Sequence, residues 1–77
     1  MQDKSTERMI MKKKYFSGRK IFVVRNRKKL ELGQLAKKSG ITESHLKEIE
    51  QEHVKPSIRT IIQLAEALDV DVEMFFD

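Results

Sequence analysis

The stretch LELGQLAKKSGITESHLKEIEQ, residues 30–51, decides the fold of this 77-residue chain. Leucine and alanine recur at helical spacing over residues 32–38, and Gly40 ends that segment because glycine readily adopts a left-handed backbone. Thr42 is a favourable N-cap for a second helix at about 43–51, whose leucine and isoleucine fall on one side. The pattern predicts two short helices joined by a tight turn.

A helical spacing of apolar residues continues on both sides of this pair. Residues 18–29 form one helix before it, residues 58–68 form another after it, and VEMFF at 72–76 forms a short last helix. No segment keeps the alternation that is typical of a strand. The sequence therefore predicts a compact all-α domain of five helices over residues 18–77, preceded by a flexible basic tail at 1–17.

Residue usage argues against several classes of protein. The chain has no cysteine, so it has neither a disulfide nor a thiolate zinc site. His45 and His53 have no third ligand at metal spacing, and the chain has no glycine-rich phosphate loop, so we expect no metal, no cofactor and no enzymatic activity. Apolar runs such as IFVV at 21–24 are too short to span a bilayer, and we see no signal peptide. We expect a cytoplasmic, nucleoid-associated protein without a membrane partner or a small-molecule ligand.

The formal net charge of +4 hides an asymmetry between the two halves of the chain. Residues 1–38 hold 13 Lys and Arg against 3 Asp and Glu, a balance of +10, and residues 39–77 hold 3 against 9, a balance of −6. Such a split indicates one face for a polyanion and another that faces away from it. The charges therefore favour a nucleic acid as partner over an unspecialised solvated surface.

The central stretch, together with KPSIRTIIQLAEALDVDVEMFF at 55–76, resembles the Cro and phage-repressor type of helix-turn-helix, the xenobiotic-response-element-like (XRE) family. The resemblance covers about residues 18–77. It implies a lambda-repressor-like domain that binds double-stranded DNA sequence-specifically and regulates transcription, as a repressor-like homodimer on a pseudo-palindromic operator. The skeleton that carries the resemblance consists of Leu35, Ala36, Gly40, Leu46, Ile49 and Glu50.

The resemblance makes residues 43–51 the recognition helix, yet this helix is acidic. With Leu46 and Ile49 turned inward, the helical wheel also turns Glu50 inward, where a carboxylate needs a partner. The resemblance implies Arg25 as that partner, in a structural ion pair. It implies base contacts from the exposed positions Thr42, Glu43, Ser44, Lys47 and Glu48, although a merely solvated charged face is the alternative.

Phosphate contacts dominate affinity for DNA, and most candidates for them lie outside the acidic helix. The phosphate-contacting candidates are Arg25, Arg27, Lys28, Lys37, Lys38, Gln51 and Lys55. The tail lysines Lys12, Lys13 and Lys14 form a possible DNA-binding arm, or are simply solvated. The apolar end of the chain suggests a dimer interface at Val72, Met74, Phe75 and Phe76, although some of these residues must complete the core.

Three positions depart from the family's pattern. Glu31 and Leu32 stand where the family has a Ser or Thr cap and a glutamine that clamps a phosphate, so the clamp is missing. Glu52 stands where the family often has glycine, and it disfavours a left-handed backbone and adds negative charge. These departures keep a second hypothesis open, that of a protein-interaction module on the same scaffold, such as a regulatory subunit or an antitoxin-like partner.

Overall fold

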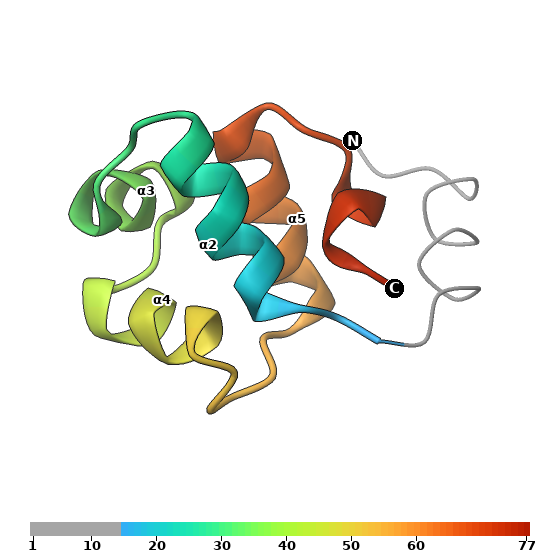
Figure 1. The fold of residues 1–77 in the computed structure, drawn as a ribbon. Helices are drawn as coiled ribbons and strands as arrows, with labels where there is room; N and C mark the ends of the chain where they lie inside the picture. The colour runs from blue at the N-terminus through green and yellow to red at the C-terminus, as the bar shows by residue number, and fades with distance from the viewer. Residues whose placement is uncertain (1–14) are drawn as a thin grey trace.

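The computed structural model describes residues 15–77, which form four α-helices and one 3-10 helix (Figure 1). The helices are α2 (Gly18–Arg27), α3 (Leu32–Ser39), α4 (Glu43–Glu50) and α5 (Ile58–Leu68), followed by the 3-10 helix η1 (Val72–Phe75). The predicted all-α class is confirmed, but the described residues contain four α-helices rather than five. The last segment stays a single 3-10 turn because its N–H groups bond three residues back, from Met74 to Asp71 and from Phe76 to Glu73.

Local side-chain and backbone chemistry explains where α3 and α4 begin and end. Gly40 ends α3 with a φ of 75°, as the turn between the two helices requires. The hydroxyl oxygen of Thr42 accepts the His45 N–H at 3.0 Å and caps α4. At the start of α3, the Gln34 side-chain oxygen accepts the Glu31 N–H at 2.7 Å, although no Ser or Thr caps this helix. The helix-turn-helix expected from the sequence is therefore present.

One hydrophobic core joins all of these elements. In Figure 1, α2 runs across α5, while α3 and α4 lie together on one side of the molecule. Side chains from every helix are buried between them. The core consists of Ile21, Val24, Leu35, Ala36, Leu46, Ile49, Ile61, Leu64, Ala65, Leu68, Val72, Phe75 and Phe76.

Three of the four candidates for the dimer interface are buried within a single copy of the chain. Val72, Phe75 and Phe76 are at most 7% exposed within a single copy of the chain, because η1 folds back against α2 and α5. They belong to the hydrophobic core of the protomer. Met74 alone of the four candidates is exposed, at 47%.

The start of the described chain, residues 15–17, is bonded to its end, residues 75–77, by contacts that we call the clasp. Phe16 and Phe76 form an isolated antiparallel bridge, and their rings meet edge to face with centroids 5.8 Å apart. The Ser17 N–H donates to the Phe75 carbonyl at 2.7 Å, and the Asp77 N–H donates to the Tyr15 carbonyl at 2.8 Å. The clasp fixes the point from which α2 begins. The arm candidates Lys12, Lys13 and Lys14 lie outside the described residues.

Candidate nucleic-acid interface

The packing of α4 determines which of its faces is available. Leu46 and Ile49 are fully buried, and Glu50 is only 9% exposed, so the inward face follows the helical wheel. Glu43, Ser44 and Lys47 are exposed. Helix α4 therefore presents a polar outer surface on a rigid apolar anchor.

Arg25 and Glu50 form the buried ion pair that was expected. Arg25 Nε donates to Glu50 Oε2 at 2.7 Å, and its Nη2 donates to Oε1 at 3.0 Å, so the pair is bidentate. The Arg25 Nη1 donates to the Leu30 carbonyl at 2.9 Å, and the guanidinium carbon lies 5.6 Å from the centroid of the Phe22 ring. Because Arg25 is 9% exposed and bonded on three sides, its geometry supports a role in holding α2 against α4 rather than in contacting a phosphate.

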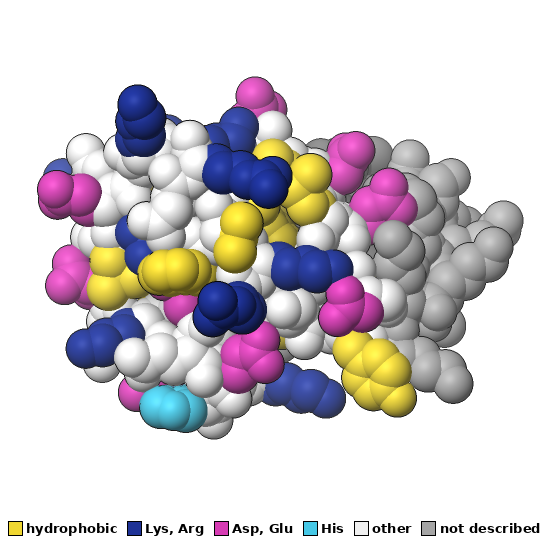
Figure 2. All heavy atoms as spheres, in the orientation of Figure 1, with side chains coloured by type: hydrophobic (Ala, Val, Ile, Leu, Met, Phe, Trp, Pro, Cys, Tyr) yellow, Lys and Arg dark blue, Asp and Glu magenta, His cyan; other side chains and the backbone are white. Residues whose placement is uncertain are grey.

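A groove of about 780 Å³ opens between α2 and the outer surface of α4. Ser44 and Lys47 border it from α4, Arg19 and Phe22 border it from α2, and Leu32 borders it from the start of α3. Figure 2 shows hydrophobic side chains over α2 and toward the end of the molecule where α3 lies, with basic and acidic side chains around them. The groove therefore has an apolar part between charged rims, which we call the α2–α4 groove.

Glu43 turns toward the start of α3. A Cβ atom at Gly33, in the first turn of α3, would collide with a carboxylate oxygen of Glu43. The absent side chain at Gly33 thus makes room for this carboxylate, whose negative charge is favourable beside the N-terminus of a helix. Glu43 borders the α2–α4 groove, but its charged group packs against α3.

Glu48 lies on another side of α4 from the groove. Its Oε1 is 3.2 Å from Nδ1 of His53, which belongs to the loop after α4. Both side chains are well exposed, at 45% for Glu48 and 61% for His53. Ser44 and Lys47 therefore border the same groove, whereas Glu48 contacts His53 outside it.

Glu52 has a left-handed backbone, with a φ of 62°, at the position where glycine would be unstrained. Its carboxylate accepts the Arg19 N–H at 3.1 Å and the Ser17 hydroxyl at 3.3 Å. The carboxylate thus satisfies one N–H group, that of Arg19, in the first turn of α2, where a negative charge is favourable. Glu52 thus ties the loop after α4 to the start of α2.

The candidate phosphate contacts do not form one patch. Lys37 and Lys38 lie in the last turn of α3, beside a hollow that they share with Gln63 and Glu66 of α5. Arg27 and Lys28 are exposed at the end of α2. Lys55 borders a second hollow beside Gly18, and Gln51 borders the α2–α4 groove. Only Gln51 and Arg25 of this set line the same groove as the exposed residues of α4.

The sequence suggested no role at the interface for Phe22, Arg19 or His53. Phe22 is 42% exposed, and its place on the helical wheel, beside the stripe of Ile21 and Val24, was the signal that could have identified it. Arg19 borders the groove from the first turn of α2, and His53 positions Glu48. Within residues 15–77, no three His, Asp or Glu side chains gather in a way that could hold a metal ion. The same part of the chain contains no helix with the length and apolar composition needed to cross a membrane.

Two short helices joined by a glycine turn, the second with an exposed polar face, define a helix-turn-helix protein. A family model described as helix-turn-helix (HTH_3) matches residues 23–75. The chain therefore belongs to this helix-turn-helix family, as the sequence predicted.

Two known proteins resemble the chain. The HTH-type transcriptional regulator SlrR of Bacillus subtilis (strain 168) is 36% identical over 61 residues, which are 78% of this chain and 40% of SlrR. The chain thus matches less than half the length of that relative. The crystal structure of the restriction-modification controller protein C.AhdI from Aeromonas hydrophila superposes with a TM-score of 0.73 and 32% identity, over 75% of this chain and 89% of that one.

Proposed function

We propose that this chain is a sequence-specific, double-stranded DNA-binding regulator of transcription, acting as a repressor-like dimer on a pseudo-palindromic operator. The observation that carries the proposal is the outer surface of α4, where Ser44 and Lys47 stand exposed while Leu46 and Ile49 anchor the helix. A helix held in this way can enter a major groove without changing its packing. The family and the likeness to SlrR and C.AhdI support the same function.

In this proposal, Lys47 and Ser44 read base edges, because a lysine donates to the acceptors of guanine and a serine hydroxyl serves several bases. Thr42 commits its hydroxyl oxygen to the His45 N–H, which leaves the hydroxyl proton to donate. Glu48 can accept from the amino group of cytosine, with His53 orienting its carboxylate. Glu43 has the weakest claim among the base-reading candidates, since its carboxylate packs over Gly33.

The dimer in this proposal must use exposed surface. Met74, with Val70 beside it, borders a shallow hollow of about 560 Å³ between α5 and η1, which is a face that a second copy could cover. Two recognition helices related by a two-fold axis would read half-sites about 34 Å apart. Sedimentation equilibrium with and without the bound duplex would measure the stoichiometry that this arrangement requires.

The experiment that tests the function is selection from a randomised duplex pool, followed by titration of the enriched duplex by fluorescence anisotropy at low and physiological salt. We expect enrichment of a two-fold site whose affinity falls steeply as salt rises. Lys47→Gln should weaken binding about 5-fold or more and relax the base preference at one position of each half-site.

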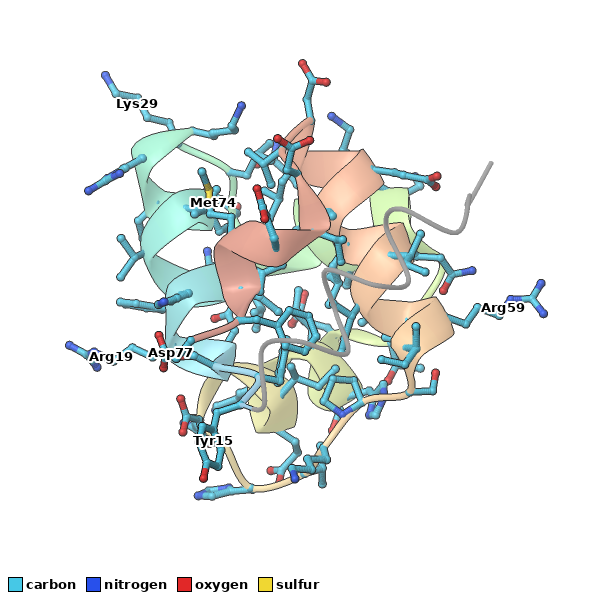
Figure 3. All side chains as sticks on the ribbon, turned by 90° about the vertical axis from the view of Figure 1, so that its right-hand side faces the viewer. Tyr15, Arg19, Lys29, Arg59, Met74 and Asp77 are labelled. Carbon is cyan, nitrogen blue, oxygen red and sulfur yellow. The ribbon has the colours of Figure 1, made fainter. Side chains whose placement is uncertain are left out.

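Arg59→Gln is the matched control, because it removes one positive charge elsewhere. Arg59 is exposed in the first turn of α5, and Figure 3 shows it and Arg19 projecting from opposite sides of the molecule. We expect Arg59→Gln to leave the base preference unchanged. An equal effect of the two substitutions would mean that Lys47 supplies only general positive charge.

The apolar part of the α2–α4 groove favours one second candidate function, that of a protein-interaction module. Phe22 is 42% exposed there and Leu32 lies where the family has a phosphate-clamping glutamine, so the surface is less polar than an ordinary DNA-binding face. A pool that yields no enriched duplex, with only weak and salt-sensitive binding, would favour this function over the first.

A further inference from the structure

We propose that the α2–α4 groove receives the sugar–phosphate backbone of one operator strand with a deoxyribose, rather than a phosphate, against Phe22 and Leu32. The inference rests on the proposed function and adds a contact of a different chemical kind to it. The groove is continuous with the outer surface of α4, because Ser44 and Lys47 border both. A duplex that lies on this surface must therefore bring one of its strands across the groove.

The apolar part of the groove, at Phe22 and Leu32, has no group that could hold a phosphate. Phe22 and Leu32 have no side-chain donor, and Leu32 is the first residue of α3, where it is partly buried against the core. Arg25 also lines the groove, but its guanidinium already donates to Glu50 and to the Leu30 carbonyl. A phosphate at this place would lose its water and gain little in return.

The charges at the rim favour the same placement. Three acids border the groove, and each is held by the chain. Glu50 is paired with Arg25, Glu52 accepts bonds from Ser17 and Arg19, and Glu43 packs over Gly33. These carboxylates repel a phosphate at the centre of the groove. Arg19, from the first turn of α2, borders the groove as well. A deoxyribose fits this distribution because it carries C–H groups between two phosphates, one of which can then lie against Arg19.

The occupant has a distinct signature in binding measurements. A contact between apolar side chains and a sugar releases no counterions, so its loss lowers affinity by the same factor at every salt concentration. The loss of Arg19 instead makes the slope of log affinity against log salt shallower by about one phosphate contact. A sugar is also present at every nucleotide, so the effect does not depend on the base at that position.

The test uses the full chain and the duplex enriched by selection. We expect Leu32→Ala and Phe22→Ala each to weaken binding about 5-fold, which corresponds to the loss of about 40 Å² of apolar contact, with an unchanged slope of log affinity against log salt. Ile58→Ala is the control, because Ile58 is an apolar residue of similar exposure, 46%, at the start of α5 and outside the groove. It should change affinity less than about 2-fold. Heteronuclear NMR spectra of each variant show whether the fold is intact; Phe22, which is exposed, serves as the variant least sensitive to packing.

Isotope-filtered NMR on the complex identifies the occupant directly. We expect cross-peaks from the Leu32 methyl groups and the Phe22 ring to deoxyribose protons of one strand. Cross-peaks only to a thymine methyl group, with a loss that depends on replacing that thymine by deoxyuridine, would overturn the inference. The inference would also be overturned if both variants kept the affinity of the unmodified protein and no cross-peaks to sugar protons appeared. That result would favour a protein partner in the groove. Failure to select any duplex would instead count against the proposed function itself, before these variants are compared.

Discussion

The substitution Glu50→Ala tests the central packing of the molecule. It would leave the Arg25 guanidinium without the two acceptors at 2.7 and 3.0 Å, in a site where the arginine side chain is only 10% exposed. Breaking a buried ion pair by removing one partner costs about 3–5 kcal/mol. We expect the lower end, about 3 kcal/mol, because the α2–α4 groove borders Arg25 and lets water approach it, and the Leu30 carbonyl still accepts from it.

The assay is urea unfolding followed by far-ultraviolet circular dichroism. A domain of this size has a free energy of unfolding of about 4–12 kcal/mol, so Glu50→Ala should remove a large part of it. With a slope near 1 kcal/mol per molar urea, the midpoint should fall by about 3 M. Glu48→Ala is the matched control on the same helix, since the Glu48 side chain is 45% exposed and its carboxylate pairs with the exposed His53. It should cost less than about 0.5 kcal/mol.

A double variant separates the effect of the two charges from the effect of the volume that their side chains fill. Replacing both Arg25 and Glu50 by methionine removes the two charges together, so the double variant should be more stable than Glu50→Ala by about 1–3 kcal/mol. The reasoning is refuted if Glu50→Ala costs less than about 1 kcal/mol, or if the double variant is the less stable of the two. Either result would mean that Arg25 finds adequate hydration without its carboxylate.

Three further substitutions test the local geometry. Gly18→Ala should lower the melting temperature, measured by circular dichroism, by about 5–15 °C. The added Cβ would collide with the Ile49 carbonyl oxygen and push α2 away from α4. An unchanged melting temperature would contradict this close approach of the two helices. Thr42→Ala should cost about 1 kcal/mol in urea unfolding through loss of the cap on α4, whereas Thr42→Ser should cost little. Glu52→Ala should be less stable than Glu52→Gly by about 1 kcal/mol. Both variants lose the hydrogen bond to α2, but only alanine places a side chain on a backbone with a φ of 62°. Equal stabilities of the two variants would show that the left-handed backbone is not strained.

The features that the sequence predicted well are those determined by nearby residues. The turn at Gly40 and the cap at Thr42 depend on positions within three residues of each other, so the ends of α3 and α4 could be predicted. The inward turn of Glu50 follows from the 3.6-residue period once Leu46 and Ile49 are buried. Only the partner of Glu50, which lies 25 residues away, needed the family resemblance.

The features that it missed depend on how distant segments meet. Glu52 looked unfavourable from its own position, yet its carboxylate bonds to Ser17, 35 residues earlier in the chain. The α2–α4 groove combines residues from three helices, so no local pattern indicates it. Phe75 and Phe76 illustrate a different limit, because hydrophobicity alone does not distinguish a side chain that completes the core from one that binds a second copy.

The acidity of residues 43–52 is explained by the partners of its glutamates. Glu50 is neutralised by Arg25, Glu52 bonds to the first turn of α2, Glu48 lies against His53, and Glu43 packs over Gly33 beside the start of α3. Each carboxylate is thus held by the chain itself. Between these glutamates, Ser44, Lys47 and Gln51 are exposed and border the α2–α4 groove. A segment that carries four negative charges, three of them on α4, can in this way still present a donor surface to a polyanion, because the position of each charge matters more than their sum. We therefore expect the affinity for DNA to follow Lys47 and the groove rather than the net charge of the helix.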